Sequence, residues 1–245
     1  MKNISWYMRF IKRIIKRYLK VRRNWSLHNQ QLISINSMEE FLNYVDKNNY
    51  DTFLMYKDKS NEKREDFNAV MNYLKIDLSG QNFLDIGPAY GDSLDICYDG
   101  GAKSIDFIEI DPFFFTFNRL KAYTKGYNVD RFRGLKTLER RKYSLIWIKG
   151  AFSADLFIKM KLVLRLSAWL TNLELLASPL AKIIICPHWR HDNQIRKIED
   201  VYNNYFTRIM LHNGYKILPT IKNHNDDLEY PITFYKDMSV HKLSF

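Results

Sequence analysis

A short glycine-containing turn is the part of the sequence best suited to chemistry. It runs Gly87-Pro-Ala-Tyr-Gly91 and follows an apolar segment at 82–86 that ends in Asp85-Ile86. Glycine allows the backbone to turn sharply at the end of a strand and allows a ligand to approach it closely. A helix that begins after Gly91 would offer free N–H groups to an anionic or electron-rich group. The turn is therefore a candidate ligand-binding loop.

A carboxylate stands at the end of the next expected strand. Glu109 lies 18 residues beyond Gly91, within Ile108-Glu-Ile-Asp-Pro112. A carboxylate there can accept hydrogen bonds from both hydroxyls of a ribose. A dinucleotide and S-adenosylmethionine both contain such a ribose. The dinucleotide fingerprint requires Gly-x-Gly-x-x-Gly, whereas position 89 is alanine.

Two further strand ends offer groups that could act on a bound substrate. Lys149 follows the fourth expected strand, and Pro-His-Trp-Arg-His at 187–191 follows the fifth. Ligands of open α/β sheets bind beyond the carboxyl ends of the strands. Neutral histidine can remove a proton from a hydroxyl at cytoplasmic pH, so His188 is the first candidate for a general base and His191 the second. The alternative is that these are surface-loop residues without a role.

Alternating strands and helices would position these groups. The pattern predicts strands at 82–86, 104–110, 128–132, 144–148, 183–186, 215–221 and 232–235, and helices at 93–98, 113–123, 153–176 and 193–213. Repeated βα units imply a parallel sheet with helices on both faces. The last two strands are joined by a loop too short for a crossover helix, so they should pair antiparallel. The expected fold is α/β: a Rossmann-like, doubly wound, seven-stranded mixed sheet with an antiparallel terminal hairpin.

The ordered set of motifs resembles the class I S-adenosylmethionine-dependent methyltransferases over about residues 70–238. The first motif of that family has an acidic residue, then glycine, three residues and glycine, which Asp85, Gly87 and Gly91 match. Its second motif ends the second strand with an acidic residue, which Glu109 matches. The terminal hairpin matches the family's reversed seventh strand.

The resemblance implies a cofactor, S-adenosylmethionine, whose methionine part contacts the turn and whose ribose binds Glu109. The cofactor-binding residues that it implies are Asp85, Gly87, Pro88, Ala89, Tyr90, Gly91, Glu109 and Ile110. It would make Lys149, His188 and His191 the candidates for catalysis.

Two positions depart from the family pattern. Leu135 stands where many members carry an acidic residue after the third strand, which leaves the adenine contact unassigned. Lys149 stands where metal-dependent O-methyltransferases carry an aspartate. Because a cation replaces a hard oxygen ligand, we expect no metal ion and a metal-independent O-methyltransferase.

The first 25 residues form a separate basic segment. They hold nine basic residues and no acidic one, which leaves only +2 of the net charge of +11 for residues 26–245. On a helix the apolar side chains of this segment fall on one side and the basic ones opposite. Such a helix suits the plane of an anionic membrane surface. The alternatives are a helix docked on the domain, a nucleic-acid-binding arm and a mitochondrial presequence.

Three parts are expected along the chain. Residues 1–25 form the membrane-binding amphipathic helix, residues 26–69 a linker (26–36) followed by N-terminal helices, and residues 70–245 the methyltransferase domain. The charged stretch 57–66 is expected to be a loop that leads into a helix ending near Leu74. Ser37-Met-Glu-Glu40 has the form of a capping box. Two cysteines cannot form a disulfide framework, which indicates a reducing compartment. We expect a cytoplasmic protein that is peripherally associated with the membrane.

These features favour a methyltransferase that O-methylates a sugar or glycan at the cytoplasmic membrane surface. The chain is loosely similar to methyltransferases of surface-polysaccharide biosynthesis, and a catalytic domain of about 170 residues leaves no added recognition domain. An RNA or DNA methyltransferase is an alternative, but nucleic-acid enzymes usually carry a basic face on the domain itself. The other alternative is a non-catalytic, membrane-associated module with the same fold.

Overall fold

A seven-stranded mixed sheet forms the centre of the fold. The computed structural model describes residues 30–48, 60–128, 134–153, 163–188, 205–218 and 233–241. The strand order is β3-β2-β1-β4-β5-β7-β6. The strands are β1 Asn82–Ile86, β2 Ser104–Ile108, β3 Thr124–Tyr127, β4 Tyr143–Ser153, β5 Ala177–His188, β6 Lys216–Ile217 and β7 Phe234–Asp237. The first five run parallel, and β7 is antiparallel to both β5 and β6, which confirms the predicted Rossmann-like sheet and its terminal hairpin.

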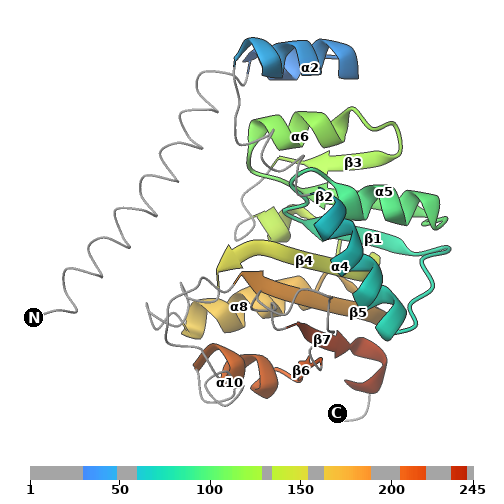
Figure 1. The fold of residues 1–245 in the computed structure, drawn as a ribbon. Helices are drawn as coiled ribbons and strands as arrows, with labels where there is room; N and C mark the ends of the chain where they lie inside the picture. The colour runs from blue at the N-terminus through green and yellow to red at the C-terminus, as the bar shows by residue number, and fades with distance from the viewer. Residues whose placement is uncertain are drawn as a thin grey trace, which may run out of the picture.

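Helices cover both faces of the sheet (Figure 1). They are α2 Met38–Lys47, α4 Ser60–Tyr73, α5 Asp92–Asp99, α6 Pro112–Arg119, α8 Val163–Glu174 and α10 Tyr205–His212, with short 3-10 turns η1 Gly134–Thr137 and η2 Met238–His241. Successive side chains of a strand point to opposite faces. Phe83 of β1 accordingly packs in one apolar cluster with Phe67 of α4, while Leu84 packs in another with Leu170 of α8 and Phe206 of α10. None of the helices among the described residues is long and apolar enough to cross a membrane.

The third strand lies earlier in the chain than predicted. β3 is Thr124–Tyr127 rather than 128–132, and residues 129–132 lie outside the described part of the chain. Glycine weakens a strand in most settings. Here Gly126 is needed, because a Cβ on it would lie 2.5 Å from the ring of Phe107 and 2.8 Å from that of Phe115. The two aromatic rings pack over the bare backbone, which no local pattern indicates.

The strands β4 and β5 are longer than predicted. The register between them shifts after Lys149, and Ser153 pairs with His188 at their far ends. Ser153, where a helix was expected to begin, is therefore still in a strand. The helix that follows begins at Val163 in the part that the structure describes.

The segment ahead of α2 is packed, so the prediction of a linker is wrong for residues 30–36. Residues 30–34 are helical, and Leu32 and Ile35 are buried with aromatic side chains of α2 and α6. Ser37 is the N-cap of α2 and accepts the N–H of Glu40 at 3.1 Å, which confirms the capping residue. Figure 1 shows α2 beyond α6 at the β3 end of the sheet. The basic segment 1–25 lies outside the described residues, and its helix remains a prediction.

Helix α4 corrects another loop prediction. The charged stretch 57–66 reads as a loop in sequence, but from Ser60 onward it is helical. Phe67 of this helix is buried against Phe83 and Trp147 of the sheet, with ring centroids 6.0 and 4.9 Å apart respectively. The helix therefore packs on the sheet ahead of residue 70, where the predicted domain begins.

Candidate functional site

The glycine turn joins β1 to α5 in an unusual backbone conformation. Gly87 and Gly91 both have φ of 82°, and Ala89 between them has φ of 51°. Left-handed φ values are readily adopted by glycine and disfavoured for residues with a Cβ. The N–H of Gly87 donates to the carbonyl of Ile108 at 2.8 Å, and the N–H of Gly91 donates to that of Pro88 at 2.9 Å. The turn is thus fixed against the end of β2, and Gly91 is the N-cap of α5.

Asp85 connects β1 to the start of α5. It is buried, with 1% of its surface exposed, and its Oδ2 accepts a hydrogen bond from the hydroxyl of Ser93. The same helix carries Cys97, whose pKa is raised above its ordinary value, first by burial and then by the charge of Asp85. Asp85 therefore ties the helix to the strand immediately before the turn.

Glu109 lies against the turn, as its place at the end of β2 predicted. Its Oε2 accepts the N–H of Ala89 at 3.3 Å, and its Oε1 accepts the N–H groups of Ile110 at 2.7 Å and Asp111 at 2.9 Å. Burial raises the pKa of Glu109 to about 7, although these three backbone bonds lower it and only the charge of Asp111 adds to the rise. The structure thus brings together the two motifs that the sequence pointed to.

Carboxylates surround the start of α5. Asp92 is 4% exposed, and Asp95 follows in the first turn of the helix. Arg64 of α4 lies 3.9 Å from a carboxylate oxygen of each, and Lys121 lies 2.7 Å from Asp95. The N-terminus of a helix ordinarily favours a phosphate. Here the first turn already carries two acidic side chains, whose charges Arg64 and Lys121 offset.

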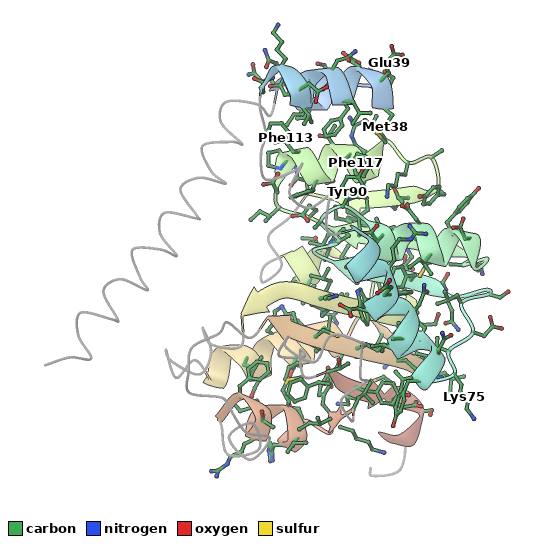
Figure 2. The ribbon with its side chains drawn as sticks, viewed as in Figure 1. Met38, Glu39, Lys75, Tyr90, Phe113 and Phe117 are labelled. Carbon is green, nitrogen blue, oxygen red and sulfur yellow. The ribbon has the colours of Figure 1, made fainter. Side chains whose placement is uncertain are left out.

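Helix α6 supports the turn from a second side. The ring of Tyr90 stacks on that of Phe117, with centroids 4.6 Å apart and planes at 29° (Figure 2). The side-chain amide of Asn118 donates to the carbonyl of Ala89 at 2.7 Å. Lys121 donates to the carbonyls of Tyr90 at 3.4 Å and Gly91 at 3.3 Å. Sequence reasoning missed Asn118 and Lys121, because their position in a predicted helix carries no signal of contact with the turn.

Lys149 lies within β4, before its end at Ser153, and not after the strand as predicted, and it has a partner that the sequence did not indicate. It forms an ion pair with Asp66 of α4, and the two side chains are 24% and 30% exposed. Trp147 pairs with Asp85 in the sheet, so Lys149 stands two residues further toward the end that carries the turn. Asp66 was missed because the charged stretch around it was taken for a loop.

The histidines of the fifth strand are only partly within the described residues. His188 is the last residue of β5, and its backbone pairs in register with Ser153 at the carboxyl end of the sheet. This is the strand end at which the sequence placed the general base. His191 lies outside the described residues, so its role remains a prediction.

The correction of β3 changes one comparison with the family pattern. Leu135 lies in η1 and is buried in the apolar core with 1% exposed, so it does not follow the third strand directly. The residues directly after β3 are Asn128 and the segment 129–133, which includes Asp130 and lies outside the described residues. The acidic residue that many family members carry after the third strand should therefore be compared with the residues that follow Tyr127, and not with Leu135. Within the described ranges, no group of three or more His, Cys, Asp or Glu side chains could hold a metal ion.

Comparisons with known proteins concern the fold. No family model matches the sequence, and the search of curated proteins finds no match. Solved structures similar to this chain include a magnesium protoporphyrin IX methyltransferase from Synechocystis PCC 6803 with bound S-adenosylmethionine, at 17% identity and a TM-score of 0.47 over 71% of this chain and 78% of that one. A second is an S-adenosylmethionine-dependent methyltransferase from Archaeoglobus fulgidus, at 16% identity and a TM-score of 0.47 over 75% of this chain and 97% of that one. A third is a ribosomal protein L11 methylase from Lactobacillus delbrueckii subsp. bulgaricus, at 14% identity and a TM-score of 0.45 over 68% of this chain and 74% of that one. At these identities the similarity extends to the fold alone.

Proposed function

We propose that this protein is an S-adenosylmethionine-dependent methyltransferase. The observation that carries the proposal is the hydrogen bond between the carboxylate of Glu109 and the N–H of Ala89. It joins the acidic end of β2 to the turn after β1, which are the two places where a class I cofactor would be held. A ribose bound by Glu109 would then lie beside the start of α5.

The sequence of the turn favours this cofactor over a dinucleotide. S-adenosylmethionine has no pyrophosphate, so its loop does not need the closely spaced glycines that hold one. Position 89 is alanine, which the dinucleotide fingerprint does not allow. Asp92 and Asp95 at the start of α5 are offset by Arg64 and Lys121, so their charges do not decide between the two cofactors.

In the proposed reaction an acceptor hydroxyl attacks the methyl carbon of the cofactor. The carbon–oxygen bond forms as the carbon–sulfur bond breaks, and the electron pair of that bond passes to sulfur to give S-adenosylhomocysteine. His188, at the end of β5, takes the proton of the hydroxyl. The ammonium of Lys149, within β4 and level with the turn after β1, stabilises the negative charge that develops on the oxygen, so that no metal ion is required.

The acceptor is proposed to be a sugar or glycan at the cytoplasmic face of a membrane. Support comes from the sequence, because the basic charge is concentrated in residues 1–25 while the remainder of the chain carries only +2. Attraction to anionic lipids would hold the enzyme at the surface where lipid-linked glycans are assembled. We place the protein in the cytoplasm, peripherally bound to that membrane.

Binding of S-adenosylhomocysteine, measured by titration calorimetry, tests the proposal. We expect the full chain to bind it and Glu109→Ala to weaken binding by about tenfold or more, since the variant leaves ribose donors without an acceptor. Glu139→Ala is a matched control, because Glu139 is exposed and precedes β4 at the amino ends of the parallel strands, whereas the turn follows the carboxyl end of β1. Absence of binding by the unaltered protein would overturn the proposal.

Two further experiments separate the finer alternatives. A methyl-transfer screen against nucleotide sugars, lipid-linked glycans and RNA distinguishes a glycan enzyme from a nucleic-acid enzyme, and turnover with none of them favours a non-catalytic module. Flotation with anionic liposomes, with and without residues 1–25, tests the membrane contact. Equal flotation of both proteins would contradict the assignment of that contact to the basic segment.

A further inference from the structure

Asn118 makes the shortest hydrogen bond between helix α6 and the turn. It lies in the last turn of α6 and is fully buried, with 0% of its surface exposed. Its Nδ2 donates to the carbonyl of Ala89 at 2.7 Å and to that of Phe114, one helical turn back, at 3.0 Å. The amide therefore uses both of its N–H groups, one on its own helix and one on the turn.

The same side chain occupies the space beside Gly91. A Cβ on Gly91 would collide with Oδ1 of Asn118 and lie 2.9 Å from its Cγ. Gly91 also has φ of 82°, so both its conformation and its surroundings require glycine. The missing side chain at position 91 is what allows the amide of Asn118 to reach the turn.

Ala89 is held on both sides in a conformation that is costly for it. Its φ is 51°, which is unfavourable by about 1–2 kcal/mol for a residue with a Cβ. Its N–H donates to Glu109 and its carbonyl accepts from Asn118. The two bonds together keep the N–H directed at the carboxylate of Glu109.

We propose that Asn118 is a positioning residue of the cofactor site. By holding the carbonyl of Ala89, it keeps the N–H of Ala89 on Glu109 and so fixes the carboxylate that would bind the ribose. Lys121 contributes longer bonds to the carbonyls of Tyr90 and Gly91, at 3.4 and 3.3 Å, and does not reach Ala89. The inference rests on the proposed function for the identity of the ligand, and on the contacts above for the role of Asn118.

The test compares two variants of Asn118 with a matched control. Asn118→Leu keeps a side chain of similar size without a donor, and Asn118→Ala removes the amide altogether. Asn172 of α8 provides the control, because its Nδ2 also bonds to the carbonyl one helical turn back, that of Ala168 at 2.8 Å, but on an exposed helix surface. We expect both Asn118 variants to bind S-adenosylhomocysteine about tenfold more weakly, since they leave the partly buried carbonyl of Ala89 without its donor, and Asn172→Leu to bind it normally.

The pH dependence of binding separates positioning from a merely structural role. The N–H of Ala89 lowers the pKa of Glu109, while the neighbouring charge of Asp111 raises it and stays in place in the variants. Loss of the Asn118 bond should loosen Ala89 and move the midpoint of binding to higher pH, whereas general destabilisation would lower the melting temperature without moving that midpoint. If the unaltered protein binds the ligand and either folded variant keeps its affinity and midpoint, the inference is overturned and the proposed function stands. If the unaltered protein does not bind, the proposed function itself fails.

Discussion

The ring of Tyr90 stacks on the ring of Phe117, and this contact connects the turn to the N-terminal part of the chain. Phe117 also lies against Phe41 of α2, with centroids 5.8 Å apart. On the same helix, the guanidinium of Arg119 donates to the carbonyl of Ile35 at 2.7 Å. Helix α6 therefore lies between the glycine turn and residues 30–47 and contacts both of them.

The first prediction concerns the stability of this packing. Phe41 is fully buried, so Phe41→Ala should lower the free energy of unfolding by about 3–5 kcal/mol through lost burial and a residual cavity. Leu42→Ala is the control, because Leu42 is 41% exposed and its loss should change stability by about 0.5 kcal/mol or less. Urea denaturation of the three proteins measures both effects. Similar losses in the two variants would contradict the packing of α2 on α6.

The second prediction is that affinity for S-adenosylhomocysteine rises with pH. The pKa of Glu109 is raised to about 7, mainly by burial, so the carboxyl is partly protonated at neutral pH. Ribose hydroxyls donate to the ionised form, so binding should release a proton and strengthen between about pH 6 and about pH 8. Calorimetry in buffers of different ionisation enthalpy counts that proton. Glu109→Gln should bind with no such dependence, and an unaltered protein whose affinity is flat over this range would contradict the role of Glu109.

The third prediction follows from the same pKa but needs no ligand. Because the folded pKa of Glu109 lies above its ordinary value of 4.5, the folded protein keeps a proton that the unfolded chain releases. The tighter hold on this proton stabilises the folded protein by about 3 kcal/mol below pH 4.5. This contribution is lost as the pH rises to about 7. As the pH rises across this interval, the free energy of unfolding of the unaltered protein should fall relative to that of Glu109→Gln, because glutamine does not titrate. A difference that stays constant with pH would mean that Glu109 titrates normally.

The sequence predicted the elements whose residues are fixed by burial alone. β1 was predicted to the residue at 82–86, because its buried side chains Phe83, Leu84 and Ile86 form a short apolar run that ends where the glycine turn begins. The meeting of Glu109 with the turn followed from topology, since adjacent parallel strands β1 and β2 end at the same edge.

The remainder depended on contacts between distant parts of the chain. β3 could not be located because Gly126 is explained only by the rings of Phe107 and Phe115 that pack over it. Asp66 and Asn118 are ordinary polar residues of helices until their partners, Lys149 and Ala89, are known. Their roles come from a side chain 83 residues away and a backbone carbonyl 29 residues away in sequence, which no local pattern contains.

The fourth prediction concerns the ion pair between Lys149 and Asp66. Both side chains are partly exposed, so solvent screening should limit their coupling to about 0.2–1 kcal/mol in a double-mutant cycle of Lys149→Met and Asp66→Asn. The matched contrast is Lys142 with Asp106, which lie 2.6 Å apart with Asp106 only 3% exposed, and whose coupling should be larger. Lys149→Met should leave the affinity for S-adenosylhomocysteine within about twofold, because Lys149 is placed with the acceptor and not with the ribose. A large loss of cofactor affinity in this variant would contradict that placement.

The fifth prediction separates the two reasons for glycine at position 91. Gly80 and Gly91 both have positive φ, 71° and 82°, but a Cβ on Gly80 would meet nothing within 4 Å. Gly80→Ala should therefore lower stability only by the conformational penalty of about 1–2 kcal/mol. Gly91→Ala should lower it further, because the added Cβ collides with Oδ1 of Asn118 and lies 2.8 Å from Nζ of Lys121.

A second substitution isolates the steric part of that loss. Asn118→Ala removes the atoms that collide with the new Cβ, so Gly91→Ala should be less destabilising in the Asn118→Ala background than alone. Lys121 is flexible and can move away, whereas the buried amide of Asn118 is held by Ala89 and Phe114. Thermal and urea unfolding of the four proteins in the cycle give the coupling. Strictly additive losses would mean that Gly91 is required by its backbone conformation alone, and that Asn118 does not share its space.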